Sequence, residues 1–161
     1  MLKISTFIWD GRQLVPLSGF SGPVSDPLYV EGAIEITANG SVLFSKGMAD
    51  LVDQLWAELI NALEALAQYK AFASYFPDQA IRFEIAPIDS SRWKWLVECH
   101  GITSAIFDGN QAMKVLLAEG LAFFEIMAKL NPTQIRLYDN CISRIKTLMT
   151  KMDAGVRGAP L

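Results

Sequence analysis

Apolar and polar side chains alternate most strictly in residues 81–99, IRFEIAPIDSSRWKWLVEC. Alternation with a period of two is typical of β-strands that bury one face. A short central loop sets Ile85 opposite Trp95. The same register places Arg82 opposite Glu98. Because apolar pairs then share one face and opposite charges share the other, the stretch predicts an antiparallel hairpin.

Two further hairpins are predicted upstream. The dipeptides Asp10-Gly11 and Asn39-Gly40 each separate two extended runs, and both favour the positive φ angles that a two-residue turn needs. In the second hairpin this turn sets Ile36 opposite Leu43. The extended runs are residues 3–9 and 12–17 in the first hairpin, and 28–38 and 41–45 in the second.

A first helix is predicted over residues 50–69, where apolar side chains recur at helical spacing. Asp50 is the expected N-cap, and Asp53 in the first turn complements the helix dipole. The face opposite the apolar side carries acids and no base. We expect that face to be open to solvent or to a partner.

A second helix is predicted over residues 108–130, with Asp108 or Asn110 as its cap and Asn131-Pro132 as its end. Apolar side chains cover most of its circumference, so the last helix or a second subunit is needed to bury it. That last helix is expected from about residue 133 to residue 152.

The order of elements predicts an α+β fold: an antiparallel sheet of about six strands, from three hairpins, with three helices packed on one face. Residues 102–107 are interpreted as one more short strand. The chain of 161 residues is 52% hydrophobic and 19% charged, which favours one folded domain and excludes disorder. We expect that domain over residues 1–154 and a flexible tail over residues 155–161.

Location and partners are constrained by charge and hydropathy. The net charge of −3 provides no basic field for nucleic acid. The most apolar stretch, residues 116–130, is shorter than the roughly 20 residues of a membrane span and holds three charges. The first ten residues lack the long apolar run of an export signal. These features predict a cytoplasmic protein that binds no membrane, with Cys99 and Cys141 as free thiols.

No motif in the sequence indicates catalysis. His100 is the one histidine, and Cys99 beside it on a strand points to the opposite face, so the two form no nucleophile–base pair. Metal-ligand spacings and a phosphate-binding glycine loop are also missing from the sequence. We therefore expect a protein that is not an enzyme and takes no metal or cofactor.

Charge is distributed unevenly along the chain. Residues 1–69 hold eight acidic and three basic residues, whereas residues 129–161 hold six basic and two acidic ones. A segregated acidic surface steers a basic partner, although solvated helix faces give the same pattern. The candidate partner-binding residues are Asp26, Glu31, Asp53, Glu58, Asn61 and Glu64.

The order of motifs over residues 32–98 resembles small bacterial immunity-type proteins of polymorphic or contact-dependent toxin systems. The resemblance is carried by GAIEITANG (32–40), DLVDQLW (50–56), FPDQ (76–79) and the strand that begins at Ile81. It implies a small, acidic, cytoplasmic domain that occludes a toxin. Because such proteins share no catalytic residues, the resemblance assigns none here.

Two functions are therefore predicted. The first is a non-enzymatic protein-binding domain, an immunity-type protein that binds and neutralises a cognate, basic bacterial toxin. The alternative is a small-ligand-binding or oligomeric accessory protein that uses the apolar helix at residues 108–130, with a homodimer as one form.

Overall fold

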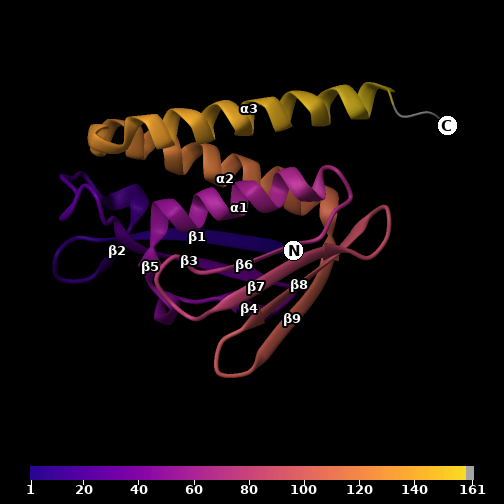
Figure 1. The fold of residues 1–161 in the computed structure, drawn as a ribbon, viewed down its shortest axis with the longest axis horizontal. Coiled ribbons are helices and arrows are strands. Elements are labelled where there is room, and N and C mark those ends of the chain that lie inside the picture. Colours follow the sequence, from indigo (N-terminus) through magenta and orange to yellow (C-terminus); the bar gives the residue numbers. More distant parts are fainter. Residues whose placement is uncertain (159–161) are drawn as a thin grey trace.

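The computed structural model describes residues 1–158, in which nine strands form two antiparallel sheets beside three α-helices (Figure 1). The strands are β1 (Leu2–Trp9), β2 (Leu14–Pro16), β3 (Glu31–Ala38), β4 (Ser41–Phe44), β5 (Asp50–Leu51), β6 (Phe72–Tyr75), β7 (Arg82–Pro87), β8 (Arg92–Glu98) and β9 (Ile102–Asp108). The helices are α1 (Val52–Leu66), α2 (Gly109–Leu130) and α3 (Ile135–Gly158). Short 3-10 turns lie at Leu17–Gly19, Lys46–Met48 and Pro132–Gln134.

The α+β class is confirmed, but the single sheet of about six strands is wrong. One sheet has the order β2-β1-β3-β4, with β5 paired to β3, and the other has the order β6-β7-β8-β9. The edge strands β4 and β9 contact each other, and Asn39 Nδ2 donates to the Ile106 carbonyl at 2.8 Å. The two sheets therefore adjoin at these edges without forming one hydrogen-bonded ladder.

The register of the β7–β8 hairpin is confirmed. Ile85 lies opposite Trp95, and Arg82 lies opposite Glu98 at a side-chain distance of 3.5 Å. The register of this hairpin follows from the sequence because both faces of both strands agree on it.

The β3–β4 hairpin has the predicted turn, with φ of 49° at Asn39 and 84° at Gly40. A bulge between Ile36 and Thr37 then sets Ile36 opposite Phe44, so the predicted pairing with Leu43 is wrong. The extra residue in a bulge turns successive side chains toward the same side, and here both Leu43 and Phe44 are buried.

The β1–β2 turn is longer than the two residues predicted. Trp9 pairs with Leu14, which leaves residues 10–13 in the turn. The Asp10 carboxylate accepts the backbone N–H groups of Arg12 and Gln13 at 2.8 and 2.9 Å. These bonds support the turn together with a backbone bond, in which Asp10 N donates to the Gln13 carbonyl at 3.0 Å.

The predicted cap of the first helix is wrong. Asp50 lies in β5, where it pairs with Gly32 of β3. Its carboxylate accepts from the backbone N–H groups of Leu51 and Asp78. The carboxylate is therefore used to hold the segment before β7 and does not cap α1, which begins at Val52.

The other helix ends follow the sequence more closely. Asp108 caps α2 as predicted, with its carboxylate accepting from Gln111 N at 2.7 Å. The last helix is longer than predicted because α3 continues through Gly158, into the expected tail. The rest of that expected tail, residues 159–161, lies outside the described residues.

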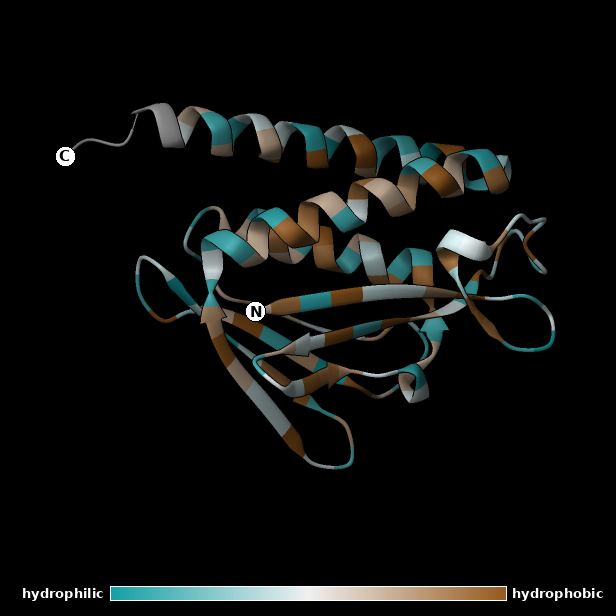
Figure 2. Ribbon diagram, turned by 180° about the vertical axis from the view of Figure 1, so that it is seen from behind, coloured by the Kyte–Doolittle hydropathy of each residue, from teal (hydrophilic) through white to brown (hydrophobic). Residues whose placement is uncertain are grey.

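The helices form two layers on the strands. Helices α1 and α2 contact strands of both sheets, and α3 packs mainly on α1 and α2 (Figure 1). Figure 2 shows more polar colour along α3 than along α2. Helix α2 is therefore enclosed by strands, α1 and α3, and the burial of its apolar circumference needs no second subunit.

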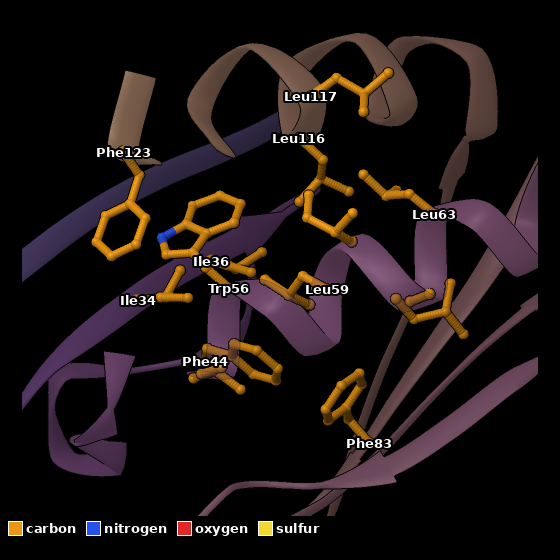
Figure 3. Packing of buried hydrophobic residues seen from close by; sticks show 14 of the residues in the cluster. Ile34, Ile36, Phe44, Trp56, Leu59, Leu63, Phe83, Leu116, Leu117 and Phe123 are labelled. Atoms are coloured by element: carbon orange, nitrogen blue, oxygen red, sulfur yellow. The ribbon is translucent and has the colours of Figure 1, made fainter. Parts of the chain in front are cut away.

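The core joins all of these layers. Trp56 of α1 stacks on Phe123 of α2 with ring centres 5.9 Å apart, above Ile34 and Ile36 (Figure 3). Gly120 permits the close approach of the two helices, because a Cβ there would lie 3.3 Å from the Trp56 ring. None of the described helices has the length and apolar content that crossing a membrane requires.

Candidate protein-binding site

A buried polar network joins α1, α3 and the connection between α2 and α3. The Tyr138 hydroxyl donates to Asp53 Oδ2 at 2.8 Å, and Asn131 Nδ2 donates to the Tyr138 oxygen at 3.0 Å. All three side chains are buried, and only 3% of Asp53 is exposed. We call these three residues the polar hub. Buried polar groups bonded in this way fix one arrangement of the helices around them.

Burial dominates the electrostatics of the hub. Removal from water raises the pKa of Asp53, against the lowering effect of the Tyr138 hydroxyl and the Gln54 backbone N–H. The pKa of Tyr138 is raised too, by burial first and by the Asp53 carboxylate second. Among the side chains that the structure describes, residues 1–155, Asp53 forms no ion pair. The hub is therefore held by hydrogen bonds alone.

The hub also anchors the loop between the 3-10 turn at Leu17–Gly19 and β3. Asn131 Nδ2 donates to the Pro27 carbonyl at 2.9 Å, in addition to its bond to Tyr138. Asp26 closes a local turn by accepting the Leu28 N–H at 3.0 Å. The Val30 carbonyl accepts the Val52 N–H at 2.9 Å. Three separate bonds thus hold this loop in one conformation.

The anchored loop presents large apolar side chains to solvent. Leu28 is 57% exposed and Tyr29 is 59% exposed, whereas Val24 and Val30 on either side are buried. The buried valines attach the loop to the core, so Leu28 and Tyr29 are held outward by the fold. Exposed aromatic and aliphatic side chains on a fixed backbone are typical anchors of protein interfaces.

A small pocket of about 150 Å³ lies beside these anchors. Asp26 and Glu31 both line it, together with Trp9, Val24 and Tyr29. Asp10 lines an adjoining hollow, and the backbone N–H groups of Gln13 and Arg12 lower the pKa of its carboxyl. We call Trp9, Asp26, Leu28, Tyr29 and Glu31 the loop site. It combines an apolar centre with an acidic border.

The structure brings together two of the six predicted partner-binding residues, Asp26 and Glu31. The prediction that the acidic face of α1 is open to solvent or to a partner is wrong. Asp53 is buried in the hub, and Glu58 is half-buried.

Asn61 and Glu64 on the same face bind Arg144 of α3, which donates to both Glu64 oxygens at 2.7 Å. The Arg144 guanidinium lowers the pKa of Glu64. The acidic face of α1 is therefore complemented by a basic residue of this chain. Part of the charge asymmetry in the sequence is accounted for by this internal contact.

The sequence did not identify Leu28 and Tyr29 as site residues. The indication in the sequence was that these two large apolar residues directly follow residues 18–27, a segment rich in Gly, Ser and Pro. A surface loop that only connects two strands needs no large apolar side chains. Leu28 and Tyr29 therefore indicate contact with another molecule.

The remaining reactive side chains are separate from the loop site. Cys141 is buried, which raises the pKa of its thiol, and Cys99 is half-exposed. His100 has a φ of 55° in the turn before β9. Across the described part of the chain, no three His, Cys, Asp or Glu side chains group as a metal site. Comparison of the chain with protein-family models, curated proteins and solved structures finds no match.

Proposed function

We propose that this chain is a non-enzymatic domain that binds a basic protein partner through the loop site. The observation that carries the proposal is the pair Leu28 and Tyr29, both more than half exposed on a loop anchored from the hub. Exposed apolar groups on a mobile loop would lose entropy on binding, whereas a fixed loop avoids most of that cost.

The acidic border supports a basic partner. Asp26 and Glu31 share one pocket, and Asp10 is close to it. Carboxylates around an apolar centre steer a positively charged surface and fix its orientation, while the apolar centre supplies most of the affinity. The arrangement fits a macromolecular surface better than a small molecule, because the pocket of about 150 Å³ is small.

The partner we propose is a cognate bacterial toxin, so that the chain acts as an immunity-type protein. The resemblance of residues 32–98 to such proteins supports this, and so does a binding surface that requires no catalytic group. The proposed mode of action is occlusion: the loop site covers a basic surface of the toxin and blocks its access to substrate.

The first experiment asks whether the partner exists. The chain and the product of the neighbouring gene are co-expressed, the pair is purified, and growth is measured with the toxin alone and with both proteins. We expect a stable complex and restored growth. If the two products do not associate and growth is not restored, the immunity assignment is wrong.

The second experiment asks whether the loop site makes the contact. Tyr29→Ala is expected to weaken binding of that partner at least tenfold, by titration calorimetry, because an exposed aromatic anchor is lost. Tyr69→Ala is the matched control, since Tyr69 is 72% exposed at the other end of α1. Equal affinities of the two variants would place the interface elsewhere.

A further inference from the structure

The pocket in the loop site lies where β1 and β3 stop pairing. Ile8 and Gly32 are the last residues paired between the two strands, so Trp9 and Glu31 come next to each other one step further on. Facing residues of antiparallel strands point to the same face of the sheet, with Cβ atoms about 5 Å apart. Both residues line the pocket. The strand register therefore places an indole ring beside a carboxylate.

The loop before β3 contributes most of the remaining lining of this pocket. Val24 and Val30 are buried and add apolar surface, and Tyr29 adds a second aromatic ring. Asp26 adds a second carboxylate, of which Oδ1 accepts the Leu28 N–H at 3.0 Å. The pocket thus combines an apolar, aromatic lining with two carboxylates, one from a strand and one from the anchored loop.

The two carboxylates of the pocket have no counter-ion within the chain. Among side chains 1–155, which the structure describes, Asp26 and Glu31 form no ion pair, not even with Arg12 of the adjoining β1–β2 turn. The acidic face of α1 differs in this respect, because Glu64 there binds Arg144. The negative charge at the pocket is therefore available to a cation from another molecule.

The size of the pocket favours a single long side chain. Its volume of about 150 Å³ is half of the roughly 300 Å³ at which small-molecule pockets begin. At about 30 Å³ per water molecule, it equals the space of roughly five waters. Of the two long cationic side chains, arginine suits the lining better. Its planar guanidinium stacks on aromatic rings and binds carboxylates through paired N–H groups, whereas the lysine ammonium is a compact, strongly hydrated charge.

We infer that the pocket of the loop site receives one arginine side chain of the protein partner. The guanidinium lies against the Trp9 ring and donates to the carboxylates of Glu31 and Asp26. The methylene groups of the arginine pack on Val24 and Val30. One side chain thus supplies an apolar stem for the lining and a cation for two carboxylates without counter-ions. The inference rests on the proposed function, because it names the residue by which the loop site recognises a basic partner.

The first test needs no partner. The ¹⁵N-labelled full-length chain is titrated with N-acetyl-arginine methylamide, and the indole N–H signals are followed, with the Trp9 signal assigned from Trp9→Phe. We expect saturable binding that shifts the Trp9 signal, at least fivefold weaker binding of the lysine analogue, and no saturable binding of the neutral citrulline analogue. Absence of saturation, equal affinity for the lysine or citrulline analogue, or shifts confined to the other tryptophans would overturn the inference, even where the product of the neighbouring gene binds.

A matched pair of variants tests the carboxylate. Glu31→Gln is expected to weaken binding of the arginine analogue at least fivefold. Glu35→Gln is the control, because Glu35 lies in the same strand outside the pocket lining and its loss changes the net charge equally. Equal affinities of the two variants would show that Glu31 does not bind the guanidinium. Thermal denaturation confirms that both variants are folded.

The partner supplies the second test. Its arginines are replaced by lysine one at a time, and we expect one replacement to weaken the complex at least tenfold. A complex that tolerates every such replacement would overturn the inference and leave the proposed function intact. If the arginine analogue binds at Trp9 but the product of the neighbouring gene does not associate, the partner assignment fails and the specificity of the pocket stands.

Discussion

Asp53 is a buried carboxylate whose hydrogen bonds come from a tyrosine hydroxyl and the backbone, with no ion pair among the described residues. Such a group is costly to bury, yet its contact with Tyr138 connects the start of α1 to α3 and, through Asn131, to the loop that carries Leu28 and Tyr29. At the scale of single residues, the position of the loop site depends on this network.

Loss of the Tyr138 hydroxyl is predicted to destabilise the fold. Tyr138→Phe leaves Asp53 Oδ2 without its donor and Asn131 without one acceptor, which costs roughly 1–3 kcal/mol for buried groups. Urea denaturation measures the change, with Tyr75→Phe as the control because Tyr75 is 60% exposed. Equal midpoints for the two variants would mean that the hub contributes nothing to stability.

The raised pKa of Asp53 predicts a specific dependence of stability on pH. The folded chain keeps the carboxyl proton to higher pH than the unfolded chain, whose value is near 3.8. The stabilising contribution is therefore complete below that value and is lost as pH rises through the folded pKa. Asp53→Asn removes this loss, so the free energy of unfolding should shift in favour of the variant as pH rises from 3.8 through the folded pKa. A difference that stays constant over this range contradicts the raised pKa.

At the scale of elements, β3 pairs with β1 and packs against the start of α1 at Gly32, a position that only glycine fits. A Cβ at Gly32 would overlap the Phe7 carbonyl oxygen and lie 2.9 Å from a Val52 methyl group. The backbone oxygen cannot move without breaking the β1–β3 ladder, so the contact fixes how closely strand and helix approach.

Gly32→Ala is accordingly predicted to destabilise the chain by about 1–3 kcal/mol, the usual penalty of overpacking. Gly19→Ala is the control, because a Cβ at Gly19 meets no atom within 4 Å. Thermal denaturation followed by circular dichroism compares the two. Equal melting temperatures would show that β3 can shift away from β1.

Elements with two consistent faces, and a cap that bonds within its own helix turn, were predictable from the sequence, whereas side-chain hydrogen bonds to other segments or within irregular turns were not. The β7–β8 register follows from alternation on both strands, and the α2 cap follows from Asp108, three residues before the Gln111 N–H that it accepts. In contrast, Asp50 and Asp10 bind backbone groups that a local pattern does not specify. Strand β6 was missed because its four residues, FASY, give too short an alternation.

The same distinction applies to the candidate site. Asp26 and Glu31 are candidates from the sequence because charge is visible there, and the structure places both in the lining of one pocket. Asp53 was misplaced because whether a helix face is covered depends on α3, which is distant in the chain. The loop that carries Leu28 and Tyr29 is held in part by the bond from Asn131 to Pro27, a contact over 104 residues that no local pattern shows.

At the scale of the whole molecule, the acidic first helix and the basic last helix contact each other. Arg144→Met is predicted to destabilise the chain by about 1 kcal/mol, since a two-pronged contact with Glu64 at a partly exposed position is lost. The loss should shrink at high salt. Arg136→Met, at an exposed position of α3, is the control in denaturation at low and high salt. A loss that is equal for both variants, or independent of salt, contradicts this assignment.

The central claim is that a loop anchored from the polar hub is the surface that binds a protein partner. Hydrogen exchange of the chain, measured alone and in complex with the product of the neighbouring gene, tests it most directly. The account predicts new protection in residues 24–31 and in the adjoining β1–β2 turn, with α3 unchanged. Protection confined to α3 or to the outer face of the β6–β9 sheet would contradict it.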